Sequence, residues 1–227
     1  MVNLLAIDTA TDTFSVALAS GADTWLFEAN AGLRHSELLM DSIDMLCKTT
    51  ALQPKDMSGV LCMGGPGSFT GLRIGFSAAK GLALSLGIPF AAIPTLDCMA
   101  WPLRSLPAII VPVLDAKKQA FFCALYRDGK RLCPDMDFEP EEIMNNIQLT
   151  MKGESTAPVI LVGPGAAMLY ETLAPDTPVS LGKGLRWGNA EALLHIAQET
   201  RIFAHNLVDY SAGPHYIRKS DAEIQRG

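Results

Sequence analysis

The two halves of this chain repeat the same order of short apolar and amphipathic segments, and no other feature limits its fold as strongly. Each half opens with an apolar run that ends on an aspartate, Asp8 in the first and Asp115 in the second. Each half later contains a Gly-Pro-Gly turn between an apolar run and a helix-like stretch, at Gly65–Gly67 and at Gly163–Gly165. Because alternating strands and helices form a sheet covered by helices, we expect two α/β lobes, each with a mixed sheet.

Strand and helix periods are clear in the first half. Large residues alternate at Phe14, Val16 and Leu18, which is the period of a strand, whereas the charged residues of Ser36–Thr50 recur at helical offsets. The predicted strands of this half are Asn3–Ile7, Phe14–Ala19, Thr24–Ala29, Val60–Met63 and Pro89–Ile93. The predicted helices are Ser36–Thr50, Thr70–Leu86 and Leu96–Arg104.

The second half shows the same order with shorter elements. A strand at Ala120–Arg127 and the turn Asp128–Gly129 predict a hairpin with a short third strand after it. The other predicted elements are strands at Ala108–Leu114 and Val159–Val162, and helices beginning near Pro140 and covering Ala166–Leu173 and Asn189–Thr200.

The junction between the lobes is expected at Pro102–Pro107. Residues 1–104 would then form the N-terminal lobe and residues 105–227 the C-terminal lobe. The final segment is expected to pack back near the first lobe.

The net charge of −6 disfavours a stand-alone nucleic-acid binder, because neutralising phosphates requires lysine and arginine. Basic pairs at Lys117–Lys118, Lys130–Arg131 and Arg218–Lys219 are interpreted as solvated loops, with a role facing RNA as the alternative. The 5 cysteines are an odd number without CxxC spacing, which disfavours a disulfide framework and a zinc site.

No targeting signal is expected, since "MVNLLAIDTATD" has no basic region and reaches Asp8 too early for a signal peptide. The most apolar stretch, "GFSAAKGLALSLGIPFAAI", is interrupted by Lys80, Gly87 and Pro89 and does not have the composition of a membrane span. We therefore expect a soluble, cytoplasmic protein.

The glycine-rich segment "MGGPGSFTGLRIG" (Met63–Gly75) could be a phosphate-binding loop. It lacks the Gly-Lys-Ser/Thr end of a Walker P-loop, the GxGxxG spacing of a Rossmann turn and the GxSxG of a nucleophile elbow. Two interpretations remain. Backbone N–H groups at a helix N-terminus suit an anion, or Gly71, Gly75 and Ala79 let the helix lie close to the sheet or to another helix.

Two segments, "LLAIDTATDTFSVAL" and "GGPGSFTGLRIGFSAAKGLALSLGIP", resemble the TsaB (YeaZ) family, and the end "HYIRKSDAEI" is similar to that family's C-terminal segment. The resemblance covers nearly the whole chain. It implies the actin-like fold of actin, sugar kinases and heat-shock chaperones. This is an RNase H-like α/β fold with two duplicated lobes, each with a mixed sheet flanked by helices, and it agrees with the repeat.

The resemblance also implies a function in tRNA modification. Proteins of this family are regarded as non-catalytic subunits of the complex that makes N6-threonylcarbamoyladenosine at adenosine 37 of tRNA. The catalytic paralogue TsaD would be the partner in a heterodimer, TsaE a small ATPase of the same complex, and TsaC the source of the threonylcarbamoyl-AMP donor. The family further implies a homodimer when TsaD is absent, contact with tRNA only within the complex, and no membrane association.

Comparison with the TsaD-type pattern predicts that this chain has neither a metal site nor a catalytic residue. The two metal-binding histidines of TsaD-type enzymes fall on Thr95 and Met99, neither of which replaces an imidazole. The phosphate-binding hairpins of the superfamily correspond to Asp8–Ala10 and Asp115–Lys117, which keep the aspartate and lack the following glycine. Among the histidines, His35 is the best candidate for a local cap or a partner contact.

The resemblance implies no cofactor that this chain requires. It leaves weak ATP or ADP binding open, either in the cleft between the lobes or at the joint with the partner. The candidate residues for such binding are Asp8, Thr9, Gly64, Gly65, Gly67, Asp115, Gly163 and Gly165.

The helices Ser36–Thr50 and Thr70–Leu86 supply the expected docking surface for TsaD. Their apolar residues cover more of the circumference than a helix that only covers a sheet needs, and a wide apolar surface left exposed would be a liability. The alternative is that these helices pack on each other and on the second lobe. The predicted contact residues are Leu38, Leu39, Ile43, Leu46, Gly75, Ala79 and Leu82.

Two other functions are kept as alternatives. One is an autonomous actin-fold ATPase, kinase or metalloprotease-like enzyme, against which the missing histidines and hairpin glycines argue. The other is a scaffold that presents the same helical surface to another client protein.

Overall fold

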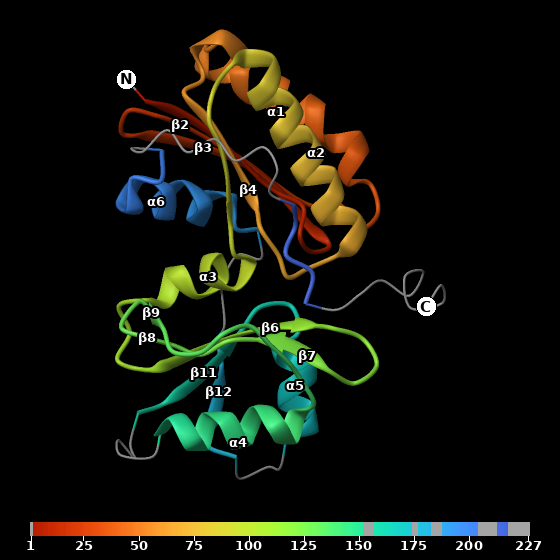
Figure 1. The fold of residues 1–227 in the computed structure, drawn as a ribbon, viewed down its shortest axis with the longest axis vertical. Coiled ribbons are helices and arrows are strands. Elements are labelled where there is room, and N and C mark those ends of the chain that lie inside the picture. The colour runs from red at the N-terminus through yellow and green to blue at the C-terminus, as the bar shows by residue number, and fades with distance from the viewer. Residues whose placement is uncertain (1, 152–156, 174–176, 183–187, 204–212, 218–227) are drawn as a thin grey trace. The chain divides into compact units, whose positions relative to one another are not determined.

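The structure is a computed structural model that describes residues 2–151, 157–173, 177–182, 188–203 and 213–217 (Figure 1). Contacts divide the chain into two compact units. One is formed by Met1–Cys98 with Gly188–Tyr216, and the other by Met99–Trp187 with Ile217–Gly227. The basic pair Arg218–Lys219 and the end of the C-terminal motif lie outside the described residues.

This division differs from the lobe boundary that the sequence analysis placed between residues 104 and 105. Helix α6 (Ala190–Thr200) belongs to the first unit, because its buried face, which includes Leu193 and Leu194, packs on the first sheet. Of the final segment, the described residues Gly213–Tyr216 also group with the first unit.

The first unit is built on a five-stranded sheet with the order β3-β2-β1-β4-β5. Strands β1, β2 and β3 are antiparallel neighbours, and β4 and β5 extend the sheet parallel to β1. All five predicted strands are confirmed. Their bounds are β1 (Asn3–Asp8), β2 (Thr13–Ser20), β3 (Asp23–Asn30), β4 (Gly59–Met63) and β5 (Phe90–Ile93).

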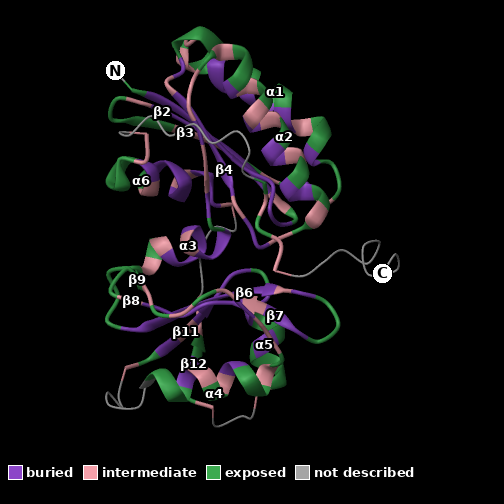
Figure 2. Cartoon of the chain, in the orientation of Figure 1, coloured by how far each residue is buried: buried purple, intermediate pink, exposed green. Residues whose placement is uncertain are grey.

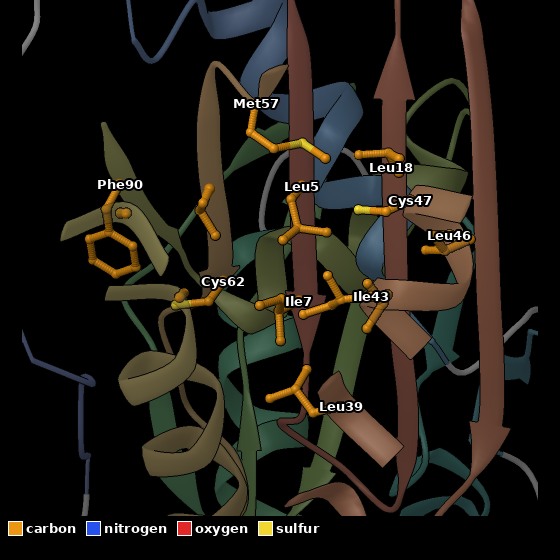
Figure 3. Packing of buried hydrophobic residues seen from close by; sticks show 14 of the residues in the cluster. Leu5, Ile7, Leu18, Leu39, Ile43, Leu46, Cys47, Met57, Cys62 and Phe90 are labelled. Atoms are coloured by element: carbon orange, nitrogen blue, oxygen red, sulfur yellow. The ribbon is translucent and has the colours of Figure 1, made fainter. Parts of the chain in front are cut away.

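Helices α1 (His35–Thr50) and α2 (Phe69–Leu86) cover one face of this sheet, and α6 covers the other (Figure 1). The alternation of side chains along β1 explains both faces. Leu5 and Ile7 join the apolar cluster beneath α1 and α2 (Figure 3), whereas Asp8 faces α6. The sheet is therefore buried on both sides.

The predicted helix Leu96–Arg104 is divided in the structure. Helix α3 (Thr95–Ala100) gives way to a 3-10 turn at Trp101–Leu103. Pro102 lies within that turn, and a proline cannot donate the backbone hydrogen bond that would continue the α-helix.

The second unit repeats the strand order of the first. Its strands follow the order β10-β7-β6-β11-β12, which matches the third, second, first, fourth and fifth strands of the first sheet, with the pair β8–β9 added at β6. The repeat read from the sequence is thus present as a repeated topology. The elements are β6 (Ile109–Asp115), β7 (Phe121–Cys123), β8 (Tyr126–Arg127), β9 (Lys130–Arg131), β10 (Met136–Phe138), α4 (Pro140–Met151), β11 (Val159–Val162), α5 (Ala166–Thr172) and β12 (Val179–Leu181).

The predicted strand Ala120–Arg127 is interrupted in the structure, and so is the strand after its turn. Both β7 and β8 run along β6, but Ala124 and Leu125 between them are not in a strand. A bulge explains the break: the N–H of Leu125 lies 3.2 Å from the sulfur of Cys133, and the pairing register has shifted by the time β10 meets β7. The tight turn itself is confirmed, since Asp128 and Gly129 both have left-handed backbones with φ of 49° and 71°.

None of the helices in the described ranges combines the length and the apolar character that crossing a lipid bilayer would require.

Candidate functional site

The glycine-rich loop and the first turn of α2 lie directly against the connection between β1 and β2. The N–H of Ser68 donates to the carbonyl oxygen of Ala10 at 2.8 Å, and the hydroxyl of Thr9 donates to the carbonyl oxygen of Gly71 at 2.7 Å. A Cβ added at Gly67 would lie 2.6 Å from the carbonyl oxygen of Ala10. This loop therefore approaches another backbone more closely than a side chain would allow.

Two further glycines keep α2 close to the same connection. A Cβ at Gly71 would lie 2.0 Å from the carbonyl oxygen of Thr9, and a Cβ at Gly75 would lie 2.4 Å from the Thr9 hydroxyl oxygen. The structure thus favours close packing of the helix on the sheet, one of the two interpretations that the sequence left open.

The start of the loop is bound by two other segments of the first unit. The N–H of Gly64 donates to the carbonyl oxygen of Ile93 at 2.6 Å, and the N–H of His215 donates to the carbonyl oxygen of Gly64 at 2.7 Å. The N–H of Thr95 donates to the carbonyl oxygen of Gly65 at 2.8 Å. Gly65 has a φ of 104°, a left-handed backbone that glycine adopts most readily.

Asp8 is fully buried, and its carboxylate accepts hydrogen bonds from two parts of the chain. The N–H of Ala10 donates to Oδ1 at 2.9 Å, and the N–H and side-chain amide of Asn189 donate to Oδ2 at 2.9 and 3.3 Å. Next to it, the N–H of Ala190 donates to the hydroxyl oxygen of Ser15 at 3.1 Å. Asp8 and Ser15 therefore accept hydrogen bonds from backbone N–H groups at the N-terminus of α6, which have no partner within the helix. The helix dipole also favours a negative charge at this end.

Burial raises the pKa of the Asp8 carboxyl above its ordinary value, and the hydrogen bonds from Ala10 and Asn189 and the nearby His35 oppose that shift. His35 is itself buried at the first position of α1. Its Nε2–H donates to the carbonyl oxygen of Thr11 at 2.7 Å, which is a local contact. The β1–β2 connection is thus held from three sides, by α1, α2 and α6.

Asp115, the corresponding aspartate of the second unit, is more exposed than Asp8. Asp115 accepts hydrogen bonds from the backbone N–H and the side-chain ammonium of Lys117, both at 2.7 Å. Burial acts to raise the pKa of Asp115, but the hydrogen bonds from Lys117 outweigh it and the pKa is lowered. Added Cβ atoms at Gly163 and Gly165 would lie 2.7 Å from the carbonyl oxygen of Val113 and 2.8 Å from the N–H nitrogen of Asp115.

The eight candidate nucleotide-binding residues divide between the two units. In the first unit, Gly67 packs against Ala10, the residue after Thr9, whereas Gly64 and Gly65 are bonded to Ile93, Thr95 and His215. Asp115 lies beside Gly163 and Gly165 in the second. Among the candidates of the first unit, many of the backbone and carboxylate groups are already hydrogen-bonded to other parts of the same unit.

Thr95 and Met99 occupy the positions of the expected metal-binding histidines. Both side chains are buried, and the hydroxyl of Thr95 has no hydrogen-bond partner. Within the described residues, no three side chains of the histidine, cysteine, aspartate or glutamate type gather in a way that could hold a metal ion.

The residues predicted to contact a partner differ in exposure within the isolated unit. Leu39, Ile43 and Leu46 belong to the buried apolar cluster of their own unit (Figure 3), and Gly75 and Ala79 are among the buried residues of α2 (Figure 2). Leu38 and Leu82 are half-buried. The apolar side chains that the two helices expose are Met40, Met45 and Leu84, at 53%, 43% and 58% of their full surface.

A groove of about 400 Å³ runs between α1 and α2 and reaches the sheet. Its lining includes Leu5 and Val60 of the sheet, Met40 and Ile43 of α1, and Leu82 of α2. Met40 is not among the contact residues predicted from the sequence, and the contacts of Asn189 and His215 were not predicted either. Asn189 directly precedes a helix, a position that favours asparagine, but nothing in the sequence indicates that it binds Asp8.

Comparisons with known proteins agree with this architecture. The family model of TsaD, tRNA N6-adenosine threonylcarbamoyltransferase, matches residues 29–225. The tRNA threonylcarbamoyladenosine biosynthesis protein TsaB of Bacillus subtilis is 33% identical over 235 residues, which cover 99% of this chain and 97% of that protein. TsaB of Escherichia coli is 26% identical over 232 residues, which cover 97% and 96%. The structure of YeaZ from Pseudomonas aeruginosa superposes with a TM-score of 0.79 at 24% identity, covering 96% of this chain and 100% of that one. The predicted actin-like fold class is confirmed.

Replacing Gly71 by alanine should destabilise the fold by about 2 kcal/mol, because the new methyl group would meet the carbonyl oxygen of Thr9. Gly81 of the same helix is the matched control. It has no atom within 4 Å of an added Cβ, so Gly81→Ala should stabilise the fold by up to about 1 kcal/mol. Urea unfolding measures both changes, and equal stability of the two variants would contradict the close-packing interpretation.

Replacing Asp8 by alanine should lower the free energy of unfolding by about 3 kcal/mol, because the N–H groups of Ala10 and Asn189 lose their acceptor in a buried site. Hydrogen exchange should show faster exchange in the first turn of α6. Asp12→Ala, which removes an exposed carboxylate from the same connection, is the control and should leave both measurements nearly unchanged.

The raised pKa of Asp8 also predicts a pH dependence. The folded state holds the Asp8 proton more tightly than the unfolded chain does, so this group favours folding most below the unfolded pKa. The stability of the native chain relative to the Asp8→Asn variant should fall as the pH rises through the folded-state pKa. A difference between the two proteins that grows with pH would show that the hydrogen-bond donors lower the pKa of Asp8 by more than burial raises it.

Proposed function

Since this chain belongs to the TsaB family of tRNA threonylcarbamoyladenosine biosynthesis proteins, we propose that it is the non-catalytic subunit that binds and supports a TsaD-type transferase in making N6-threonylcarbamoyladenosine in tRNA. The observation that carries this proposal is the similarity to TsaB proteins over nearly the full length of both chains. Participation in this biosynthesis rests on the family. The division of labour with TsaD rests on the chain's own residues.

The contacts of the first unit support a non-catalytic role. In an actin-like enzyme, the aspartate after the first strand and the glycine loop would face a nucleotide. Here the carboxylate of Asp8 is buried under α6, and the carbonyl oxygens of Thr9 and Ala10 are close to glycines of α2 and its preceding loop. A nucleotide could not reach Asp8 without displacing α6. An autonomous ATPase or metalloprotease-like enzyme is therefore the less favoured alternative.

The exposed face of α1 and α2 supports docking of a partner. Met40, Met45 and Leu84 place apolar side chains on the surface of the two helices, and the groove between them is lined mainly by apolar side chains. Exposed apolar patches of this kind are typical of protein interfaces. The TsaD family model matches this chain as well, so a TsaD partner would share its fold and could present the same pair of helices.

A contact between two equivalent helix pairs would have pseudo-two-fold symmetry. The same surface would explain a homodimer in the absence of TsaD, since a two-fold contact uses one patch on both subunits.

TsaE and the threonylcarbamoyl-AMP made by TsaC would act on the heterodimer with TsaD rather than on the isolated chain. We propose that this chain acts in the cytoplasm, requires no cofactor and binds ATP or ADP at most weakly. A scaffold for another client would use the same face.

The variant Met40→Glu/Leu84→Glu should abolish co-elution with TsaD while leaving the fold intact, because both side chains are exposed in the isolated chain. A carboxylate buried in an apolar contact costs more than about 1.4 kcal/mol, which is tenfold in affinity. Transfer of threonylcarbamoyl to tRNA by TsaD with TsaC and TsaE should fall in parallel. Substitution of Ile43 or Ala79 by arginine is unsuitable as a test, since both are buried and the fold itself would suffer.

The matched control is Leu149→Glu/Met168→Glu on α4 and α5, the equivalent helices of the second unit, whose side chains are exposed to 57% and 51%. This variant should bind TsaD normally. Normal binding by the α1/α2 variant would refute the interface. Undiminished transfer when the chain is left out would refute the proposed function.

A further inference from the structure

The second unit carries a concentration of positive charge that the chain as a whole does not have. The protein has 18 lysine and arginine residues, 24 acidic residues and a net charge of −6. Residues 101–132 nevertheless hold one third of these cations and only two of the acidic residues. The cations of this segment are Arg104, Lys117, Lys118, Arg127, Lys130 and Arg131, and its acidic residues are Asp115 and Asp128.

Half of these cations lie on one hairpin, formed by β8 and β9 around the turn Asp128–Gly129. In the repeated topology β7 and β10 match β2 and β3, and β8 and β9 form the tip of the connection between β7 and β10, which corresponds to the turn of the β2–β3 hairpin. The turn of that first hairpin, Ser20–Asp23, contains no lysine or arginine. The fold therefore does not require cations at this position, and they call for a separate explanation.

The turn of the hairpin lies next to the 3-10 turn that follows α3. A Cβ added at Gly129 would lie 3.4 Å from the Cβ of Arg104, the residue that follows the 3-10 turn. The exposed Lys130 and Arg104 thus belong to one continuous surface of the second unit.

Arg104 is oriented by a neighbouring aromatic ring. Its guanidinium carbon lies 3.8 Å from the centre of the Trp101 ring, and Nη1 donates to the carbonyl oxygen of Trp101 at 3.1 Å. The residue is exposed. One face of the guanidinium therefore rests on the indole while the residue stays accessible, and a guanidinium plane of this kind can stack on a nucleobase or bind a phosphate.

The other two arginines of the hairpin are engaged within the chain. Arg131 forms an ion pair with Asp135, and Nε of Arg127 lies 3.8 Å from the Asp128 carboxylate. Arg104 and Lys130 are consequently the two cations on which a ligand would depend most.

We propose that the surface formed by Trp101, Arg104, Arg127 and Lys130, the hairpin surface, binds the sugar-phosphate backbone of the tRNA substrate within the assembled complex. This inference rests on the proposed function. The negative charge of the rest of the chain repels RNA. A local positive surface would therefore determine which side of the chain faces the tRNA. A flat guanidinium on an aromatic ring favours RNA over an acidic protein, because it offers a stacking surface in addition to charge.

The test compares Arg104→Ala/Lys130→Ala with Lys55→Ala/Arg201→Ala, a control that removes the same charge from exposed positions of the first unit. Binding of an unmodified tRNA transcript is measured over a range of salt concentrations, for the complex with TsaD and for the isolated chain. Loss of two phosphate contacts should lower the slope of log affinity against log salt by about 2, that is by about 1 for each contact. The control should keep the slope of the native complex.

A third variant, Arg104→Lys, separates charge from stacking. It should keep the salt slope and still bind tRNA less tightly, because an ammonium group is not planar. The inference is overturned if the hairpin variant keeps both affinity and slope, if the control loses as much as the hairpin variant, or if no form of the native protein binds tRNA. Co-elution with TsaD should be unchanged in every variant.

Failure of the proposed function would look different. In that case the native chain would neither bind TsaD nor stimulate transfer, whereas failure of the hairpin inference alone would leave both intact and give the hairpin variant the tRNA affinity and salt slope of the native complex.

Discussion

The first unit depends on the hydrogen bonds that the buried carboxylate of Asp8 accepts from Ala10 and Asn189. These bonds join the end of the first strand to the start of α6, although the two lie at opposite ends of the sequence. Helix α6 covers the face of the sheet that α1 and α2 leave uncovered. A buried carboxylate without such donors would be strongly unfavourable, so the carboxylate and the helix N-terminus stabilise each other.

The two units show how one topology serves different purposes. Both have the same strand order and a Gly-Pro-Gly turn packed against the end of the first strand. In the first unit, three helices enclose the aspartate of the hairpin. In the second, Asp115 is partly exposed and is bonded by the neighbouring Lys117. The charges at the turn of the β2–β3 hairpin and at the corresponding β8–β9 tip differ as well. A partner subunit with one enclosed unit and one charged, accessible hairpin is consistent with both differences.

The helices α1 and α2 show why a correct secondary structure does not determine which apolar side chains are exposed. Their bounds were predicted closely, and their wide apolar character was read correctly from the sequence. A helix with apolar residues around most of its circumference has more than one stripe that could face the sheet, however, and periodicity alone does not choose between them. The tertiary structure turned Leu39 and Ile43 inward and left Met40 and Leu84 exposed. The contact residues chosen from the sequence were therefore mostly core residues.

The sequence by itself determined the features that depend on near neighbours: the strand and helix periods, the left-handed turn at Asp128–Gly129 and the repeated order of elements. These follow from side-chain alternation and backbone sterics within a few residues. Only the tertiary structure decided that Asp8 binds Asn189, that His215 binds Gly64, and that a bulge near Cys133 interrupts two strands. Such contacts join residues far apart in the chain or arise from a shift in strand register. Their free energy depends on how whole elements pack, which no local pattern of residues specifies.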